Sequence, residues 1–332
     1  MKTITSTAIA LVTAGAALAP QAHAQWAPSG PIEFIVTSGA GGGTDNFARM
    51  VQSIIAKHDL VEQPIIVSNK GGGSGAEGYV YAKAMGDDPH KLTFGTNNEY
   101  LLPHVARLGY KASDLNPVAT LALDEFLIWV NAESPYQDAQ SFIEAAKAAP
   151  GTLKFSGSQS KDTDQILVSM IQDATGAKFI YIPFQGGSAA GTQLAGGHVD
   201  GNTNNPNENV GQWRAGMIRP LCVFSDARLP EGPKVAGDMG WSDIPTCAEA
   251  GIPVDQYKMP RTVWTSPGVP EEATAYYADL MQKVYDTPEW KEYLANTSQT
   301  GTFLAGDDFR SFIESDEARV MKILEAEGWA VN

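Results

Sequence analysis

The sequence predicts an α/β protein with mostly parallel sheets. Three observations indicate this class: strand-like and helix-like runs alternate through most of the chain, hydrophobic residues make up 43% and charged residues 18%, and helix-like runs close the chain. Such alternation is typical of helices packed on parallel sheets. The composition is that of a globular chain and not of a disordered one.

Each predicted element rests on the spacing of its apolar residues. The helix expected over 44–58 places five of them on one face: Phe47, Met50, Val51, Ile54 and Ile55. Short apolar runs bounded by turn-forming residues predict strands. In order, the chain predicts strand 32–37, helix 44–58, strand 64–68, helix 76–85, strand 91–95, strand 126–131, helix 138–148, strand 153–156, helix 162–174, strand 179–182, helix 187–195 and strand 218–224.

The end of the chain differs from the rest. Helices are expected over 270–286, 288–296 and 306–327, with little strand between them, because Pro270, Pro288 and Gly306-Asp307 mark helix starts. No flexible linker separates two halves. The chain is therefore expected to cross between two domains more than once, near Glu125 and again within 257–266. The expected division is 25–124 plus 254–332 for one domain and 125–253 for the other.

The first 24 residues predict a secretory signal peptide. Lys2 supplies positive charge, residues 8–19 are apolar but too short to span a bilayer, and Ala22-His23-Ala24 has the form of a cleavage site. Cleavage after Ala24 would leave 308 of the 332 residues as an exported, periplasmic protein. No later segment has the length of a membrane span, so direct membrane insertion is not expected.

The net charge and the cysteine content restrict the possible partners and the possible role of disulfides. The formal charge is −15 and becomes −16 when Lys2 is removed, which argues against nucleic acid or an anionic membrane as partner. Cys222 and Cys247 are too few for a disulfide scaffold. One structural bridge and two separately buried thiols both remain open.

The sequence contains no complete motif for phosphate binding or catalysis. The chain has no G-x-x-x-x-G-K-[ST] loop, and the relaxed dinucleotide pattern Gly71-x-Gly73-x-x-Ala76 lacks an acid at the end of the next strand. No G-x-S-x-G elbow or H-E-x-x-H motif is present, and the histidines are scattered. We therefore expect no enzyme, no cofactor and no metal.

Two loops have the chemistry of an anion site. The loop "TSGAGGGTD" (37–45) and the loop "SGSQSKDTD" (156–164) each precede a predicted helix. Glycine-rich or hydroxyl-rich turns at helix starts offer backbone N–H groups and the positive end of the helix dipole. Ser160 and Asp162, taken singly, fit helix caps as well as ligand contacts. Two such loops in two α/β halves predict a cleft that holds a carboxylate from both sides.

The chain resembles the extracytoplasmic receptors of tripartite tricarboxylate transporters, the Bug or TctC-like family, from about Pro31 to Gly328. The resemblance rests on "PIEFIVTSGAGGGTDNFAR", "NKGGGSGAEGYVYA", "FIYIPFQGGSAAGTQLAGGHVDG", "RAGMIRPLCVFSDAR", "IPTCAEAGIP" and "SPGVPEEA". It implies a two-domain periplasmic binding protein, type II-like, with the ligand in a cleft and no catalytic chemistry. Backbone N–H groups of the two loops would hold the ligand carboxylate.

The sequence departs from the family pattern at positions expected to face the cleft. The second loop is not glycine-rich and lacks the usual His-Leu pair, the stretch 202–207 is rich in asparagine, and Arg261 stands where the family tends to carry an aromatic or small residue. The identity of the acid that this chain binds therefore cannot be taken over from any one family member. The expected ligand-binding residues are Ser38, Gly41, Gly42, Gly43, Thr44, Asp45, Asn97, Tyr100, Ser156, Ser158, Ser160, Lys161, Asp162, Thr163, Phe184, Asn204, Asn205 and Arg261.

The sequence thus predicts a monomeric periplasmic receptor that captures a small organic mono- or dicarboxylate and delivers it to the permease subunits of a tripartite tricarboxylate transporter. Arg261 would either pair with Glu125 or read a second ligand carboxylate. Two other classes stay open: an exported α/β hydrolase or transferase without a recognisable motif, and a ligand-sensing partner of a two-component system.

Overall fold

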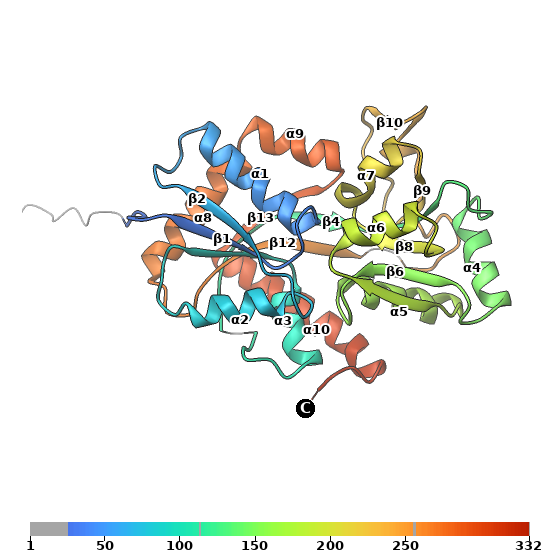
Figure 1. The fold of residues 1–332 in the computed structure, drawn as a ribbon, viewed down its shortest axis with the longest axis horizontal. Coiled ribbons are helices and arrows are strands. Elements are labelled where there is room, and N and C mark those ends of the chain that lie inside the picture. The colour runs from blue at the N-terminus through green and yellow to red at the C-terminus, as the bar shows by residue number, and fades with distance from the viewer. Residues whose placement is uncertain (1–25, 113, 255–256, 332) are drawn as a thin grey trace, which may run out of the picture.

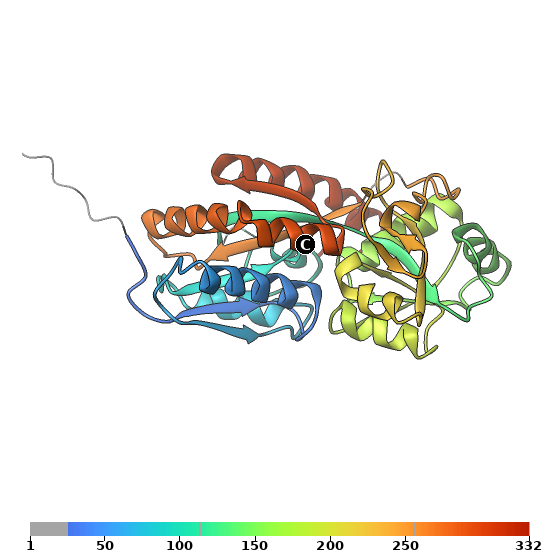
Figure 2. The same ribbon diagram turned by 90° about the horizontal axis from the view of Figure 1, so that it is seen from above.

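The computed structural model describes residues 26–331 apart from 113, 255 and 256. Two helix-flanked sheets form two lobes that lie side by side (Figure 1). The view from above shows the same division, with helix α10 running along the first lobe toward the junction (Figure 2). The α/β prediction is confirmed, whereas the predicted signal peptide lies outside the described residues.

The first lobe is built on a six-stranded sheet of order β13-β4-β12-β3-β1-β2. Its strands are β1 (Ile32–Val36), β2 (Ile65–Asn69), β3 (Lys91–Gly95), β4 (Asn116–Glu125), β12 (Lys258–Thr265) and β13 (Thr300–Ala305). Strand β1 pairs in parallel with β2 and β3, while β12 is antiparallel to β3 and β4, and β13 is antiparallel to β4. The chain segments between β1, β2 and β3 contain helices, which is the kind of crossover connection that parallel strands require.

The second lobe is built on a five-stranded sheet of order β7-β6-β8-β5-β9. Its strands are β5 (Leu127–Asn131), β6 (Lys154–Ser158), β7 (Ile180–Phe184), β8 (Gly201–Asn204) and β9 (Ile218–Val223), with a separate pair β10 (Lys234–Ala236) and β11 (Met239–Gly240). Strand β6 is parallel to β7 and β8, and β5 is antiparallel to β8 and β9. Both sheets are mixed, so "mostly parallel" holds only for the β-α-β runs of each lobe.

The helices follow the predicted runs closely, except for two, over 98–105 and 206–214, that were not predicted. The helices are α1 (Gly43–Lys57), α2 (Ala76–Ala84), α3 (Asn98–Val105), α4 (Ala139–Ala148), α5 (Thr163–Thr175), α6 (Gly187–Ala195), α7 (Pro206–Arg214), α8 (Glu271–Tyr285), α9 (Pro288–Thr297) and α10 (Gly306–Ala326). Strand β13, between α9 and α10, corrects the expectation of little strand near the end. Its partner β4 lies far away in sequence, so local periodicity did not reveal it.

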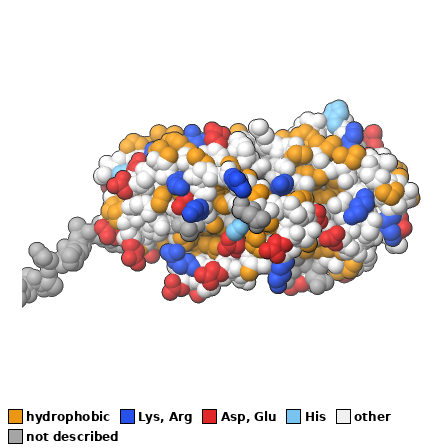
Figure 3. Space-filling view, turned by 90° about the horizontal axis from the view of Figure 1, so that it is seen from below, with side chains coloured by type: hydrophobic (Ala, Val, Ile, Leu, Met, Phe, Trp, Pro, Cys, Tyr) orange, Lys and Arg blue, Asp and Glu red, His pale blue; other side chains and the backbone are white. Residues whose placement is uncertain are grey.

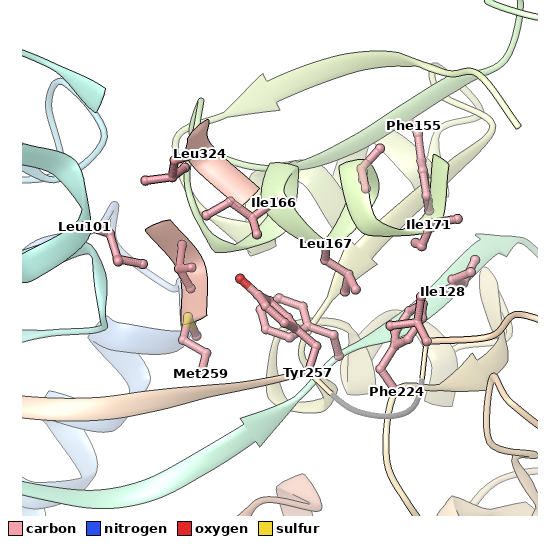
Figure 4. Packing of buried hydrophobic residues seen from close by; sticks show 14 of the residues in the cluster. Leu101, Ile128, Phe155, Ile166, Leu167, Ile171, Phe224, Tyr257, Met259 and Leu324 are labelled. Carbon is pink, nitrogen blue, oxygen red and sulfur yellow. The ribbon is translucent and has the colours of Figure 1, made fainter. Parts of the chain in front are cut away.

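The chain passes between the sheets at two places. Strand β4 ends at Glu125 and β5 begins at Leu127, with the buried Phe126 between them, and the chain returns between β9 and β12. An apolar cluster spans the junction: Leu101 and Leu324 from the first lobe belong to the same buried cluster as Ile166 and Leu167 of α5 (Figure 4). The lobes are therefore joined by a shared apolar contact on the α10 side.

The acidic side chains on the surface are not gathered in one region of the face shown in Figure 3. On that face, acidic, basic and apolar side chains are interspersed (Figure 3). Within the described ranges, no helix combines the length and the apolar character that crossing a membrane requires.

The two cysteines form a disulfide. Cys222 on β9 is bonded to Cys247, and both side chains are buried. The alternative of two separate thiols, which the sequence left open, is excluded.

We expect loss of this bridge to lower the free energy of unfolding by about 3 kcal/mol, because it closes a 25-residue loop in the unfolded chain. Urea unfolding of the Cys222→Ala/Cys247→Ala variant, compared with oxidised and reduced wild type, measures the effect. The reduced wild type should match the variant. Two titratable thiols in unreduced, unfolded protein would contradict the assignment.

Candidate functional site

Helices α1, α5, α6 and α7 begin near the junction of the lobes (Figure 1). A small cavity lies among their first residues. Its volume is about 30 Å³, which is room for about two water molecules. Helix starts present N–H groups and the positive end of the dipole, so their convergence favours negative charge. The lining residues come from both lobes: Thr37, Ser38, Gly43, Thr44, Thr96, Asn98, Ser158, Gln159, Asp162, Thr163, Gly186, Asn205, Glu208, Met259 and Arg261.

Part of the site expected from the sequence meets at this cavity. Both loops contribute, one from each lobe, and Arg261 reaches the cavity from β12. The expected residues that line it are Ser38, Gly43, Thr44, Ser158, Asp162, Thr163, Asn205 and Arg261.

The glycine loop is organised differently from the expectation. Its N–H groups were expected to face a ligand carboxylate, but the protein uses them itself. Gly41 donates to Asp45 Oδ2 at 2.8 Å, Gly42 donates to a carbonyl oxygen inside the loop at 3.2 Å, and Gly43 donates to Glu208 Oε1 at 3.0 Å. Gly41 and Gly42 do not line the cavity. The loop is a preformed turn that two protein carboxylates hold in place.

Asp45 is a structural residue of this loop and not a cavity residue. Its carboxylate accepts hydrogen bonds from Gly41, from Arg49 Nε and from Asn69 Nδ2 at 2.9 Å. Burial opposes its ionisation, but the hydrogen bonds from Arg49, Gly41 and Asn69 outweigh burial and lower the pKa of Asp45. A charged Asp45 at the first turn of α1 also suits the helix dipole.

Three expected residues of the serine loop lie away from the cavity. Ser156 is buried, and its hydroxyl donates to a backbone carbonyl of β8 at 3.4 Å. The Ser160 N–H bonds Ser74 Oγ of the other lobe at 3.2 Å, and the Lys161 N–H bonds Gln165 at 2.7 Å. The loop has a left-handed backbone at Lys161, with φ 55°.

Asn97 and Tyr100 belong to a contact between α3, α5 and α10. Asn97 Nδ2 donates to Asp316 Oδ2 at 3.1 Å and its Oδ1 accepts from Thr163 Oγ1 at 2.8 Å. The Tyr100 hydroxyl donates to the same Asp316 oxygen at 2.7 Å. Both were expected at the ligand, but the neighbouring Asn98 lines the cavity instead.

Asn204 and Phe184 also serve the interior of the second lobe. Asn204 Nδ2 donates to the Gly187 carbonyl at 2.7 Å and to Asn209 Oδ1 at 2.9 Å. Phe184 packs against the apolar cluster that contains Trp129. Neither lines the cavity, contrary to the expectation.

Arg261 has a different acidic partner from the one expected. Its Nε donates to Asp124 Oδ2 at 2.7 Å, and its Nη2 donates to the same oxygen. Nη1 donates to Thr44 Oγ1 at 3.1 Å and Nη2 to Asn205 Oδ1 at 3.2 Å. Glu125 pairs instead with Lys258, because successive residues of a strand point to opposite faces.

Glu208 is the main residue that sequence reasoning missed. It is the third residue of α7 and forms a capping box with Asn205, whose N–H its Oε2 accepts at 3.3 Å. Pro206 at the first helical position and the Asn-x-x-Glu spacing are the pattern that predicts such a cap. Nothing local, however, predicts that the other carboxyl oxygen reaches Gly43 in the opposite lobe.

Buried carboxyl groups dominate the electrostatics of the cavity. Burial raises the pKa of Asp162 to about 7. Burial, and then the charges of Asp162 and Glu208, raise the pKa of Asp164. Burial also raises the pKa of Glu208, although Arg261 opposes that shift. The cavity thus carries more potential negative charge than its arginine balances.

We expect the free energy of unfolding to fall by about 2 kcal/mol or more between about pH 5 and pH 7.5. Asp162, Asp164, Glu208 and the fully buried Glu99 all have raised pKa values in the folded protein. These four groups therefore hold more protons in the native state than in the unfolded state above about pH 4, so the stability that they contribute is full below the unfolded pKa and is lost as the pH rises. Urea unfolding across this range measures it.

A matched pair of variants tests the cause. Both carboxyl oxygens of Glu99 lack a hydrogen-bond partner, so Glu99→Gln should flatten the slope. Glu144→Gln, at an exposed ion pair, should leave the slope unchanged. A stability that rises over this range would contradict the assignment.

The site offers little to a metal ion. In the part of the chain that the structure describes, no group of three or more His, Cys, Asp or Glu side chains is arranged to hold one. The polar groups that line the cavity are hydrogen-bond donors, hydrogen-bond acceptors and charged side chains.

Comparison with known proteins identifies relatives over most of the chain. Residues 47–329 match the model of the family described as "Tripartite tricarboxylate transporter family receptor". A UPF0065 protein of Cupriavidus necator is 28% identical over 320 residues, 95% of this chain and 93% of its own. Protein BugT of Bordetella pertussis is 28% identical over 249 residues, 74% and 73% of the two chains.

Solved structures share the two-lobed architecture. A periplasmic transporter superposes with a TM-score of 0.83 at 23% identity, covering 92% of this chain and 99% of its own. An R. palustris protein solved with adipate superposes with a TM-score of 0.81 at 25% identity, covering 91% and 99%. The periplasmic binding protein BugD superposes with a TM-score of 0.81 at 18% identity, covering 91% and 99%.

Proposed function

The chain belongs to the tripartite tricarboxylate transporter receptor family, and from this membership we propose that it captures a small organic carboxylate in the periplasm and delivers it to the permease of such a transporter. Family members are solute-binding receptors and not enzymes. The signal-peptide pattern of the first 24 residues supports export. The proposed division into 25–124 plus 254–332 and 125–253 is supported by the two sheets.

The observation that carries this proposal is the convergence of helix starts from both lobes on one cavity. The start of α1 at Gly43 and Thr44 faces that of α5 at Asp162 and Thr163. First-turn N–H groups and two helix dipoles stabilise a carboxylate without a side-chain cation. An acid ligand in a related structure, the adipate complex at 25% identity, supports the same class.

Binding requires the lobes to separate. A cavity of about 30 Å³ admits one small group but not a whole acid of the size of adipate. The contacts that bridge the opening are polar and can exchange with water: Ser74–Ser160, Asn97–Thr163, Asn98–Gln159, Gly43–Glu208 and Arg261–Asn205. We propose a hinge at Phe126 and at the return near Lys258.

A thermal-shift screen followed by calorimetry tests the function. Small carboxylic acids should stabilise the protein, and the corresponding amides and methyl esters should not, because each lost charge-assisted hydrogen bond costs about 1.5–3 kcal/mol. Co-purification of membrane permease subunits tests delivery. If neutral analogues stabilise as strongly as the acids, the carboxylate function is wrong.

A further inference from the structure

One anion-binding position at the junction is already filled by the protein itself. Glu208 Oε1 accepts from the Gly43 N–H at the start of α1, and its Oε2 accepts from Asn205 at the start of α7. The start of α6 touches it as well, because a Cβ on Gly187 would lie under 3.0 Å from the Glu208 carboxyl. The guanidinium of Arg261 lies beside the same position, close to Gly43 and Glu208.

We propose that Glu208 takes the place of one ligand carboxylate, and that the ligand presents a cationic nitrogen group to Glu208 and Asp162. The receptor then selects amino acids or other amine-bearing acids over dicarboxylates. This inference rests on the proposed function, which supplies the remaining ligand carboxylate.

Three of the hydroxyl groups that line the cavity support this assignment, because their hydrogens are used within the protein. Ser158 Oγ donates to Asp164 Oδ2 at 2.6 Å, and Thr163 Oγ1 donates to Asn97 at 2.8 Å. Thr37 Oγ1 donates to a backbone carbonyl at 3.1 Å. A hydroxyl that donates its single hydrogen inward can offer only lone pairs to a ligand.

One unused acceptor at the cavity also favours a ligand that donates hydrogen bonds. Asn98 lines the cavity, is 5% exposed, and its Oδ1 has no hydrogen-bond partner among the described residues. Its Nδ2 is committed to Gln159 Oε1 at 2.9 Å. A buried acceptor without a donor costs free energy, and an N–H group of the ligand would remove that cost.

The charges around the cavity oppose the binding of a second anion. Among the described residues that line the cavity, Arg261 is the only cation, and it is shared between its buried ion pair with Asp124 and the nearby carboxyl group of Glu208. A further carboxylate there would face like charges at short range in a dry environment. An ammonium group matches both the sign and the small volume of the cavity.

Helix capping does not account for these two acids. As a cap, Asp162 uses Oδ1 for the Gln165 N–H at 3.4 Å, while its Oδ2 faces Ser158 at 3.3 Å. Glu208 likewise uses one oxygen for its cap and extends the other across the junction. The second oxygen of each acid is the one that the ligand would contact.

The test uses the full mature protein and matched ligands at about pH 7.5. Calorimetry and thermal shift would compare straight-chain ω-amino acids, dicarboxylates and monocarboxylates of equal chain length, together with the common α-amino acids and their deaminated analogues. We expect at least one amine-bearing acid to bind about tenfold or more tightly than its amine-free and dicarboxylate counterparts. Glu208→Gln should reduce that preference about tenfold, while Glu249→Gln, at an exposed capping glutamate of the same lobe, should not.

The outcomes distinguish a failure of this inference from a failure of the proposed carboxylate function on which it rests. If acids bind but dicarboxylates equal or exceed the amine-bearing acids in wild type, the inference is wrong and the carboxylate function stands. If no acid in the panel binds, the proposed function fails and the inference fails with it. Should Glu208→Gln not fold, Asp162→Asn provides the second variant, and an unchanged amine preference in that variant would overturn the inference.

Discussion

Arg261→Gln should lower the free energy of unfolding by about 3–5 kcal/mol. Arg261 is 1% exposed and its partner Asp124 is fully buried. Glutamine cannot supply the charge, so Asp124 would stay buried as an uncompensated carboxylate. The contacts to Thr44 and Asn205, which join β12 to both lobes at the cavity, would also be lost. Chemical denaturation followed by circular dichroism measures the change.

The control is the exposed ion pair of Arg228 and Glu249, whose side chains are each 48% exposed. Arg228→Gln should cost only about 0–1 kcal/mol because water screens that pair. The double variant Arg261→Met/Asp124→Leu should recover part of the loss, since it removes both charges together. If Arg261→Gln proves as mild as Arg228→Gln, the buried pair is not what holds this part of the fold.

The second large effect is expected from Gly187→Ala. Gly187 is the first residue of α6, and a Cβ there would lie under 3.0 Å from the carboxyl carbon and both oxygens of Glu208. The carboxyl group would have to leave its position, which would break its hydrogen bond to the Gly43 N–H across the junction. Overpacking costs about 1–3 kcal/mol, and the lost charge-assisted hydrogen bond costs about 1.5–3 kcal/mol more.

We therefore expect Gly187→Ala both to destabilise the protein and to change ligand affinity by more than about tenfold. Gly211→Ala is the matched control, because Gly211 lies in helix α7 and a Cβ there meets nothing within 4 Å. That control should stabilise the protein by about 0.5–1 kcal/mol through helix propensity. Equal behaviour of the two variants would show that Glu208 is free to move without consequence.

The sequence determined the family and most elements of this fold, but not, for example, α3, α7, β4, β12 and β13. The amphipathic run of α1, the strand β3 and the helix α6 were predicted to within one residue, because hydrophobic periodicity and turn residues act locally. The two loops were placed correctly at helix starts for the same reason. The family resemblance, carried by several ordered motifs, is confirmed.

The tertiary structure alone decided which groups meet at the site. Gly43 and Glu208 are 165 positions apart, and Arg261 and Asp124 are 137 apart. Whether Arg261 faces Asp124 or Glu125 depends on the register of β12 against β4, which contains a bulge between Arg261 and Thr262. Likewise, the glycine amides met protein carboxylates because the packing of the lobes brings α7 against α1. Local patterns specify helices and strands, whereas burial and long-range packing choose the partners of their side chains.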